Sequence, residues 1–434
     1  MRGAWEWYEG KEPLPVPVEE NPAPPLPYNK DENRTPLEPM PVKVEVTPIM
    51  IEPRPKPIEP IREIPHTDDK YFTIDFYGVQ CKVRLPECAP RELKDCSPKS
   101  IAAGWEQLAS GGCLDNTIRD CLETRIRYNL CDWAYLQFLE ALSHSFCTNA
   151  NDATLLMAFL YCQSGYQMRL AVDSGTLIIL YGSKHYIYGK EYYNIDGCQY
   201  YPLGNVSKSI SICNAAFDGE APMSLLITGE QLLGDELSDD RTIKSKRYDN
   251  VRGVSRVPRK LIEFYNGFPS SAIGGNPLTR WSMYANVPLA GSTRAMLYPM
   301  LTSSVEGLSE IDAANRLLNW VQTGFVYEYD DKVWGHDRAF FAEETLYYPY
   351  CDCEDRSILF SRLVRDLLGL DVALIYYPGH LATAVCFNED VDGDAMMIGD
   401  KRFVVCDPTY IGAPVGAQMP GLDYANTRAI ILNR

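Results

Sequence analysis

One helix–strand order occurs twice along the chain, and this repetition constrains the fold more than any other feature. In the first half, "NDATLLMAFLYCQSGYQMRLAV" (151–172) joins a helical apolar pattern to a glycine stop and a β-rich segment. In the second half, "CEDRSILFSRLVRDLLGLDVALIYY" (353–377) has the same order. Superposing Asp152 on Asp355 aligns "DATLLMAFL" with "DRSILFSRL" and brings the two glycine stops close together. We therefore predict a diverged internal duplication, with the His185 strand lying where the His380 strand lies.

The segments around the two copies have their own periodicities. Helical patterns are predicted at about 98–110, 115–128, 130–146 and 309–325, and β-type alternation at 70–86. The stretch 175–203 is predicted to form three short strands with glycine turns, and "GHLATAVCF" and "KRFVVCDPTY" two more, separated by the acidic turn "NEDVDGD".

The N-terminal segment has a different composition. Residues 11–65 hold 16 of the 31 prolines, which favours extended polyproline II backbone. We interpret this segment as a spacer between the folded part and an anchor or partner; a ligand for a proline-recognition domain is the alternative. The first letters, "MRGAWEWYEG", read like the end of an amphipathic helix, so we expect the native chain to begin earlier.

The length and charge of the chain limit the number of domains and the kinds of partner that it can have. At 434 residues the chain is expected to hold two or three domains. A net charge of −17 argues against nucleic acid or anionic lipid as partners. No apolar run approaches the roughly 18–20 residues of a membrane span. The fourteen cysteines sit mostly in apolar patterns without CxxC spacing, so neither a metal site nor a cofactor is predicted, and a few disulfides remain open.

Two cysteines stand out in "YYPYCDCEDRSILF". Cys353 comes directly before the apolar helical pattern, where free N–H groups and the helix dipole favour a thiolate. The acidic residues Glu354 and Asp355 suit the first turn but disfavour a thiolate nearby, so a histidinium has to outweigh them. Cys351 is interpreted as an inert neighbour, with a resolving thiol or the nucleophile itself as alternatives.

A base and an orienting group follow in the sequence. Only five histidines exist, and His380 opens the strand "HLATAVCF" directly after a "YYPG" turn, which places an imidazole near the Cys353 helix. Asp407 ends the strand "RFVVCDP" and is the best-placed group to fix the imidazole tautomer. We predict Cys353, His380 and Asp407 as the catalytic residues.

Together, "CDCEDRSILFSRLVRDLLGL", "GHLATAV" and "FVVCDPTY" resemble the transglutaminase-like superfamily of papain-related cysteine enzymes, notably large multi-domain members from Bacteroides-type bacteria. The resemblance is strong over about 300–415 and weak over about 115–203. It implies an α+β fold with two tandem transglutaminase-like units, each a helix packed on an antiparallel sheet, behind a disordered Pro-rich tether. The expected division is a tether over 1–66, a degenerate unit over 67–205, a β-rich bridging region over 206–300 and a catalytic unit over 301–434.

An oxyanion hole requires N–H donors near the nucleophile. The backbone N–H of Cys353 is the natural first donor. Gln322 or Trp320 in "NWVQTGF", or a loop residue such as Tyr348, is expected to supply the second, although core packing is the alternative for Trp320.

The implied activity is cleavage of a peptide, isopeptide or amide bond through a Cys353 thioester, on a protein, peptide or peptidoglycan-type substrate. Protein cross-linking is the enzymatic alternative, and a silent peptide- or glycan-binding module is the alternative outside catalysis. The location stays open: the cell envelope or periplasm if an export signal precedes the chain, and the cytoplasm otherwise.

Overall fold

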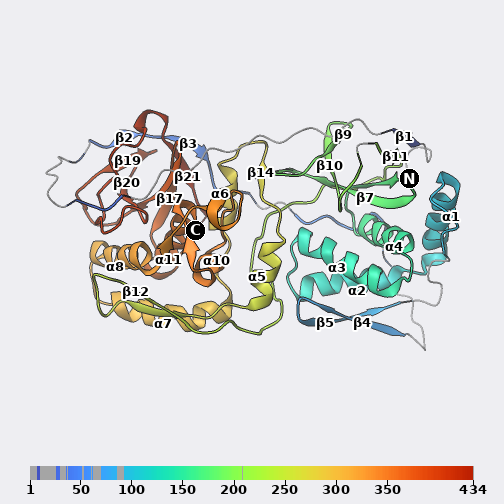
Figure 1. Ribbon diagram of the computed structural model, residues 1–434, viewed down its shortest axis with the longest axis horizontal. Helices are drawn as coiled ribbons and strands as arrows, with labels where there is room; N and C mark the ends of the chain where they lie inside the picture. The colour runs from blue at the N-terminus through green and yellow to red at the C-terminus, as the bar shows by residue number, and fades with distance from the viewer. Residues whose placement is uncertain are drawn as a thin grey trace.

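The computed structural model describes residues 7–9, 26–29, 36, 38–50, 53–59, 61, 70–85, 92–207 and 209–433. The rest of the predicted tether lies outside these residues. The chain has a mixed α+β fold, as predicted. Figure 1 shows the first half of the chain on the right and the second half on the left.

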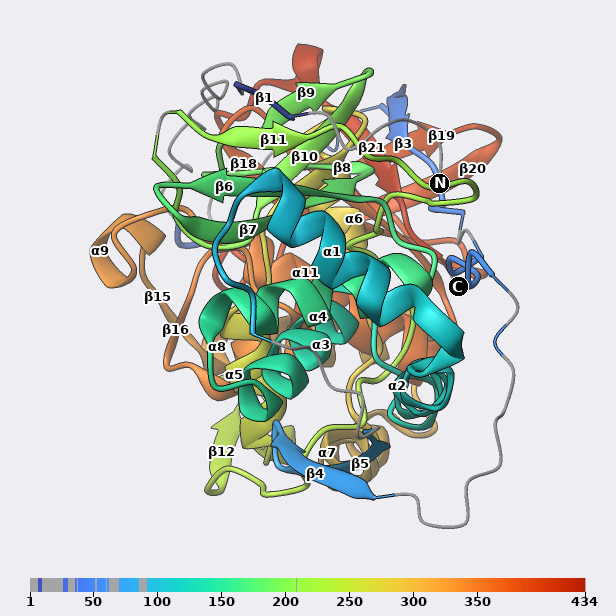
Figure 2. The same cartoon turned by 90° about the vertical axis from the view of Figure 1, so that its right-hand side faces the viewer.

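The first half is built in three layers. Figure 2 shows a sheet on top, helices in the middle and a hairpin below. The sheet has the order β1-β11-β6-β7-β10-β9. Its strands are β1 (Trp7–Glu9), β6 (Met168–Asp173), β7 (Thr176–Ser183), β9 (Tyr193–Ile195), β10 (Cys198–Pro202) and β11 (Ser211–Cys213). The helices are α1 (Pro98–Ala109), the short 3₁₀ turn η1 (Ser110–Gly112), α2 (Asp115–Arg127), α3 (Asp132–Phe146) and α4 (Ala150–Gln163), and the hairpin is β4 (Tyr71–Phe76) with β5 (Val79–Arg84).

Local sequence explains why these helices start where they do. The Ser97 side chain caps α1 by accepting from the Ser100 N–H, and Pro98 suits the first helical turn because its missing N–H is not needed there. The Asn149 side chain caps α4 in the same way. The predicted helices and the 70–86 hairpin are confirmed. The stretch 175–203 forms four strands, because β8 (His185–Ile187) separates from β7 and pairs with β14 (Ser271–Ile273) instead.

The second half places a long helix against a larger sheet. Helix α11 (Cys353–Leu368) packs on β17 (Asp371–Tyr377) and β18 (His380–Cys386). The sheet order is β2-β19-β20-β18-β17-β21-β3. The other elements are α8 (Glu310–Gly324), β15 (Val326–Tyr327), α9 (Asp330–Val333), α10 (Ala342–Tyr347), β16 (Tyr350–Cys351), β19 (Ala395–Ile398), β20 (Lys401–Cys406), the 3₁₀ turn η2 (Tyr424–Asn426) and β21 (Arg428–Ile431).

The two halves share one arrangement. With Asp152 set on Asp355, α4 corresponds to α11, and the strands β6, β7 and β10 correspond to β17, β18 and β20. Both sheets also hydrogen-bond these strands in the same order, with β9 and β19 beyond β10 and β20. The predicted place of His185 was wrong: it lies in β8, and the strand that matches β18 is β7.

The region between the halves is less β-rich than predicted. Besides β11, it contains β12 (Arg241–Lys244), β13 (Arg252–Ser255), α5 (Arg259–Asn266), β14, α6 (Thr279–Ala285) and α7 (Gly291–Val305). The expected boundary at 300/301 falls inside α7, which packs on β13 and on α8. The region contacts both halves, because β14 pairs with β8 while α6 packs against α11.

The Pro-rich segment is partly incorporated into the fold, which corrects the prediction of a disordered tether. Strands β2 (Met40–Pro41) and β3 (Lys43–Val46) follow each other in the chain but pair with opposite edges of the second sheet, β19 and β21. They therefore close this sheet into a barrel. Further along, the Ile58 N–H donates to Gln163 O at 3.3 Å, and Arg54 donates to Asn129 at 3.1 Å. The segment thus contacts both halves.

The closing strand can be tested by placing a charge in it. Val46 is buried and lies beside Ile430. Val46→Asp is expected to lower the free energy of unfolding by about 3 kcal/mol, because a carboxylate is buried without a partner. The control Met50→Asp introduces the same carboxylate at a side chain that is 84% exposed and should leave stability unchanged. Equal effects of the two variants in denaturant unfolding would show that residues 43–46 do not close the barrel.

Candidate functional site

Cys353 is the first residue of α11. Asp352 precedes it at the N-cap position, and the Asp355 carboxylate accepts from the Asp352 N–H at 3.2 Å, which fixes the entry into the helix. The helix ends at Gly369, whose φ of 69° is the left-handed conformation that glycine adopts without strain. Cys353 is 2% exposed, so the predicted nucleophile lies beneath the surface.

His380 and Asp407 form a buried pair. His380 opens β18, Asp407 directly follows β20, and the two strands are antiparallel neighbours. The distance from His380 Nε2 to Asp407 Oδ2 is 2.9 Å. The other carboxylate oxygen, Oδ1, accepts from the backbone N–H groups of Thr409 and Tyr410 at 2.8 and 3.2 Å. Asp407 is therefore held rigidly and in turn orients the imidazole.

Helix α11 meets strand β18 beside this pair. The Ser357 hydroxyl donates to Leu381 O at 2.9 Å, one residue beyond His380. The Leu381 N–H also interacts with the Cys353 sulfur and favours its thiolate form. Cys353 is thus held next to the start of the histidine strand.

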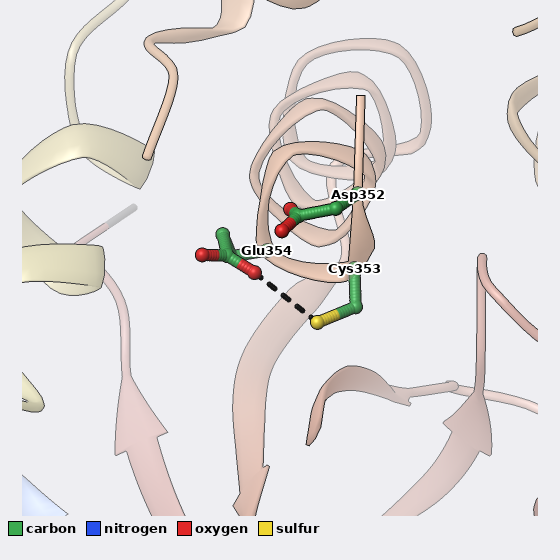
Figure 3. Close-up of side chains that lie close together, drawn as sticks. All are labelled: Asp352, Cys353 and Glu354. Atoms are coloured by element: carbon green, nitrogen blue, oxygen red, sulfur yellow. Dashed lines mark hydrogen bonds between the residues drawn. The ribbon is translucent and has the colours of Figure 1, made fainter. Parts of the chain in front are cut away.

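No hydrogen bond joins Cys353 to His380 within the described part of the chain. The Cys353 thiol donates to Glu354 Oε2 at 3.1 Å, as Figure 3 shows. His380 Nδ1 is buried and has no hydrogen-bond partner in the described structure. The structure therefore brings two of the three predicted residues into direct contact and places the third on the neighbouring helix.

The electrostatics at Cys353 oppose the thiolate that the sequence analysis expected. Burial raises the pKa of the Cys353 thiol well above its ordinary value, and the carboxylates of Glu354 and Asp352 raise it further. The helix N-terminus does not compensate for these effects. In this conformation Cys353 is a neutral thiol.

Several carboxyl groups around the sulfur are themselves perturbed. Burial, followed by repulsion from Glu354, raises the pKa of Asp330 to about 8. The pKa values of Asp352 and Asp355 are also raised well above normal, mainly by burial and then by neighbouring carboxylates. Sequence reasoning noticed the acidic residues after Cys353 but missed Asp330, which no local motif connects to the helix.

Cys351 has a packing role. It lies in β16 and is buried, its sulfur accepts from Arg356 Nε at 3.4 Å, and its thiol contacts Val326 O at 3.8 Å. Burial is the main cause that raises its pKa. In the described structure both Cys351 and Cys353 are free thiols, whereas Cys113 is disulfide-bonded.

The two predicted oxyanion donors are engaged elsewhere, which corrects that assignment. The Gln322 amide nitrogen donates to the carbonyls of Asp407, Tyr410 and Ala413 at 2.9–3.0 Å, and its oxygen accepts from the Gly412 N–H at 3.1 Å. Trp320 Nε1 donates to Ile243 O at 3.0 Å. Gln322 instead shapes the loop after β20 that contains Asp407, and Trp320 packs in the core.

The first half lacks the three reactive side chains but retains the framework. The positions that correspond to Cys353, His380 and Asp407 hold Ala150, Leu177 and Gly204. Asp152 and Asp355, in contrast, both anchor an earlier segment: they accept from the N–H groups of Leu93 and Phe340 at 2.9 and 2.8 Å. The shared aspartate is therefore structural.

Comparisons of the chain with protein-family models, curated proteins and solved structures find no match. Across the described ranges, none of the helices has both the length and the apolar character needed to cross a bilayer.

The scaffolding role of Gln322 predicts a large effect of a nearly isosteric change. Gln322→Glu replaces an amide donor by a carboxylate that repels three carbonyls, and it should lower the free energy of unfolding by about 3 kcal/mol. Gln107→Glu in α1 makes the same change away from this loop and should be close to neutral. Comparable stability of both variants in urea would contradict the assignment.

The buried Glu343 predicts a pH dependence of stability. Burial raises the pKa of Glu343 to about 8, although the Ala290 N–H opposes the shift. Native protein keeps this proton while unfolded chain releases it above about pH 4.5, so rising pH destabilises the wild type by up to about 1.4 kcal/mol per pH unit until about pH 8. Glu343→Gln should remove this dependence.

The measurement is denaturant unfolding of the wild type and Glu343→Gln at pH 5 and pH 8. The stability of the variant relative to the wild type should be higher at pH 8 than at pH 5 by more than about 1 kcal/mol. A constant difference between the two proteins would show that Glu343 is ionised at both pH values.

Proposed function

We propose that the second half of the chain is a transglutaminase-like cysteine hydrolase that cleaves peptide, isopeptide or amide bonds through a Cys353 thioester. The observation that carries the proposal is the buried His380–Asp407 pair at 2.9 Å, on the sheet against which the Cys353 helix packs. The order thiol helix, histidine strand and aspartate after the next strand is the one that the family resemblance implies.

The free imidazole nitrogen supports a proton-transfer role for His380. Nε2 is occupied by Asp407, so the unpartnered Nδ1 is the atom available to the thiol. Because the Cys353 pKa is raised, the proposed chemistry starts from a neutral thiol: His380 removes the proton as sulfur attacks the carbonyl carbon. The ion pair that forms is stabilised by Asp407.

The later steps release first the amine and then the acid. When the tetrahedral intermediate collapses, the carbon–nitrogen bond breaks and imidazolium gives its proton to the leaving amine. Water then attacks the thioester and gives a proton to His380. As the carbon–sulfur bond breaks, the imidazolium returns that proton to the sulfur, and the thiol and a carboxylic acid are released. The Cys353 backbone N–H, which at the first helical position has no acceptor within the helix, is the proposed oxyanion donor.

Access to the site requires a local opening. Cys353 and His380 are 2% and 3% exposed. Tyr327 and Tyr329 lie close enough that the charge of Cys353 helps raise the pKa of both phenols. These tyrosines belong to the segment that must move aside to admit a substrate. The burial of Cys353 and His380, together with the raised pKa of the thiol, favours a second candidate function, which is peptide binding without cleavage.

The test is turnover of labelled casein, with and without a fluorescent primary amine. Cys353→Ala, His380→Ala and Asp407→Asn should each lower the rate by about 100-fold or more, because each removes a partner of one proton relay. Cys351→Ala should retain activity, since Cys351 packs against Arg356 and Val326 and takes no part in the proton relay. Amine incorporation without new N-termini would replace hydrolysis by cross-linking.

Thiol labelling separates the enzyme from the binding module. Iodoacetamide should alkylate Cys353 at pH 7 several-fold more slowly in His380→Ala than in the wild type, because the imidazole assists loss of the thiol proton. The labelled residue is identified by mass spectrometry, with Cys353→Ala as the blank. Labelling that is slow and unaffected by His380→Ala, without casein turnover, would leave binding as the function.

A further inference from the structure

We infer that the carboxylates of Asp330, Asp337, Asp352 and Glu354 form a binding site for a hard divalent cation beside Cys353. The sequence analysis predicted no metal site, because its criterion was motif spacing. These four residues come from three places in the chain: α9, the loop after it, and the start of α11. The inference concerns binding and holds whether or not the proposed hydrolysis occurs.

Two groups of closely spaced ligand atoms share Glu354. Carboxylate oxygens of Asp330, Asp337 and Glu354 all lie within 4.8 Å of one another. A Ca²⁺ ion binds oxygens at about 2.3–2.6 Å, so two ligands on opposite sides of it lie up to about 5.2 Å apart. Asp352, Cys353 and Glu354 form a second group, whose ligand atoms also lie within 4.8 Å of one another. Glu354 therefore belongs to both groups.

Asp352 supplies the independent observation. It is 1% exposed, and neither of its carboxylate oxygens has a hydrogen-bond partner in the described structure. In Figure 3 this carboxylate points toward the side chain of Glu354. A buried carboxylate without a partner is costly, and a cation between Asp352 and Glu354 would supply one.

The surrounding positive charge does not balance the cluster. Arg280 pairs with Asp337, and the Arg338 backbone N–H donates to Asp330 Oδ2 at 2.6 Å, whereas the Arg338 guanidinium pairs with Glu344. Arg356 donates to backbone carbonyls and to the Cys351 sulfur. The neighbouring Asp355 adds a further carboxylate and accepts from two backbone N–H groups. Among the described residues, Arg280 is thus the basic side chain that forms an ion pair with one of the four carboxylates.

The donor set defines the class of ion. Four carboxylates are hard oxygen ligands, which suit Ca²⁺, Mg²⁺ or Mn²⁺. The Cys353 sulfur at the edge would join only a softer ion such as Zn²⁺. Binding of a hard cation should therefore survive Cys353→Ala, whereas Zn²⁺ binding should weaken in that variant.

The experiment is calorimetric titration of chelator-treated full-length protein with Ca²⁺, Mg²⁺ and Mn²⁺, together with the melting temperature in each ion. The wild type should bind at least one of them at one site per chain and melt at a higher temperature. Asp352→Asn and Asp330→Asn should weaken binding by tenfold or more. Asp390→Asn, in the exposed turn after β18, removes the same charge elsewhere and should bind like the wild type.

Half-exposed Asp337 keeps the test usable if the buried variants misfold. Its side chain is 39% exposed, and an asparagine oxygen can still accept from the buried Arg280, so Asp337→Asn should keep the fold and still weaken binding several-fold. The titration is repeated on Cys353→Ala, which lacks the proposed nucleophile, so failure of the proposed activity does not affect the result. Absence of saturable binding, or equal affinity in Asp337→Asn and Asp390→Asn, would overturn the inference and leave protons as the only ions that the carboxylates share.

Discussion

The buried guanidinium of Arg356 organises the second half of the chain. It is 1% exposed and donates to the carbonyl oxygens of Gln322 and Phe325 at 3.2 and 3.1 Å. It also reaches Pro408 O at 3.5 Å and the Cys351 sulfur at 3.4 Å. One charge on α11 thereby holds the end of α8, strand β16 and the loop after β20. Because desolvating such a charge is tolerated only when its donors are satisfied, these segments depend on one another, and the position of Asp407 depends on all of them.

The sequence predicted the local parts of this arrangement better than the long-range parts. The apolar spacing and the glycine stop identified α11, and the short strands that begin at His380 and end before Asp407 were recognisable from alternation. The contact between those two residues follows from strand order, which the pattern also indicated. Strand β3 was missed because its four residues, "KVEV", lie in a proline-rich segment and pair with β21 near the other end of the chain. Arg356 was missed for a similar reason: its acceptors are backbone carbonyls, which leave no signal in the sequence.

Comparison of the two halves distinguishes residues that support the fold from residues that could react. Asp152 and Asp355 both accept a hydrogen bond from the backbone of an earlier segment. The positions that match the reactive residues, however, hold alanine, leucine and glycine in the first half. A helix on this kind of sheet is therefore stable without a thiol at its start. The buried acids and the neutral thiol of the second half are additions to that framework, and their raised pKa values show that they cost stability when ionised.

The barrel that carries His380 and Asp407 also sets the order in which a growing chain can fold. Strands β2 and β3 leave the ribosome before any helix of the first half, but their partners β19 and β21 follow α11 in the chain. The first half can pack as it emerges, whereas an early strand must wait, unpaired, until β19 and β21 have been made. The barrel around the candidate site is thus completed only after both halves have been synthesised.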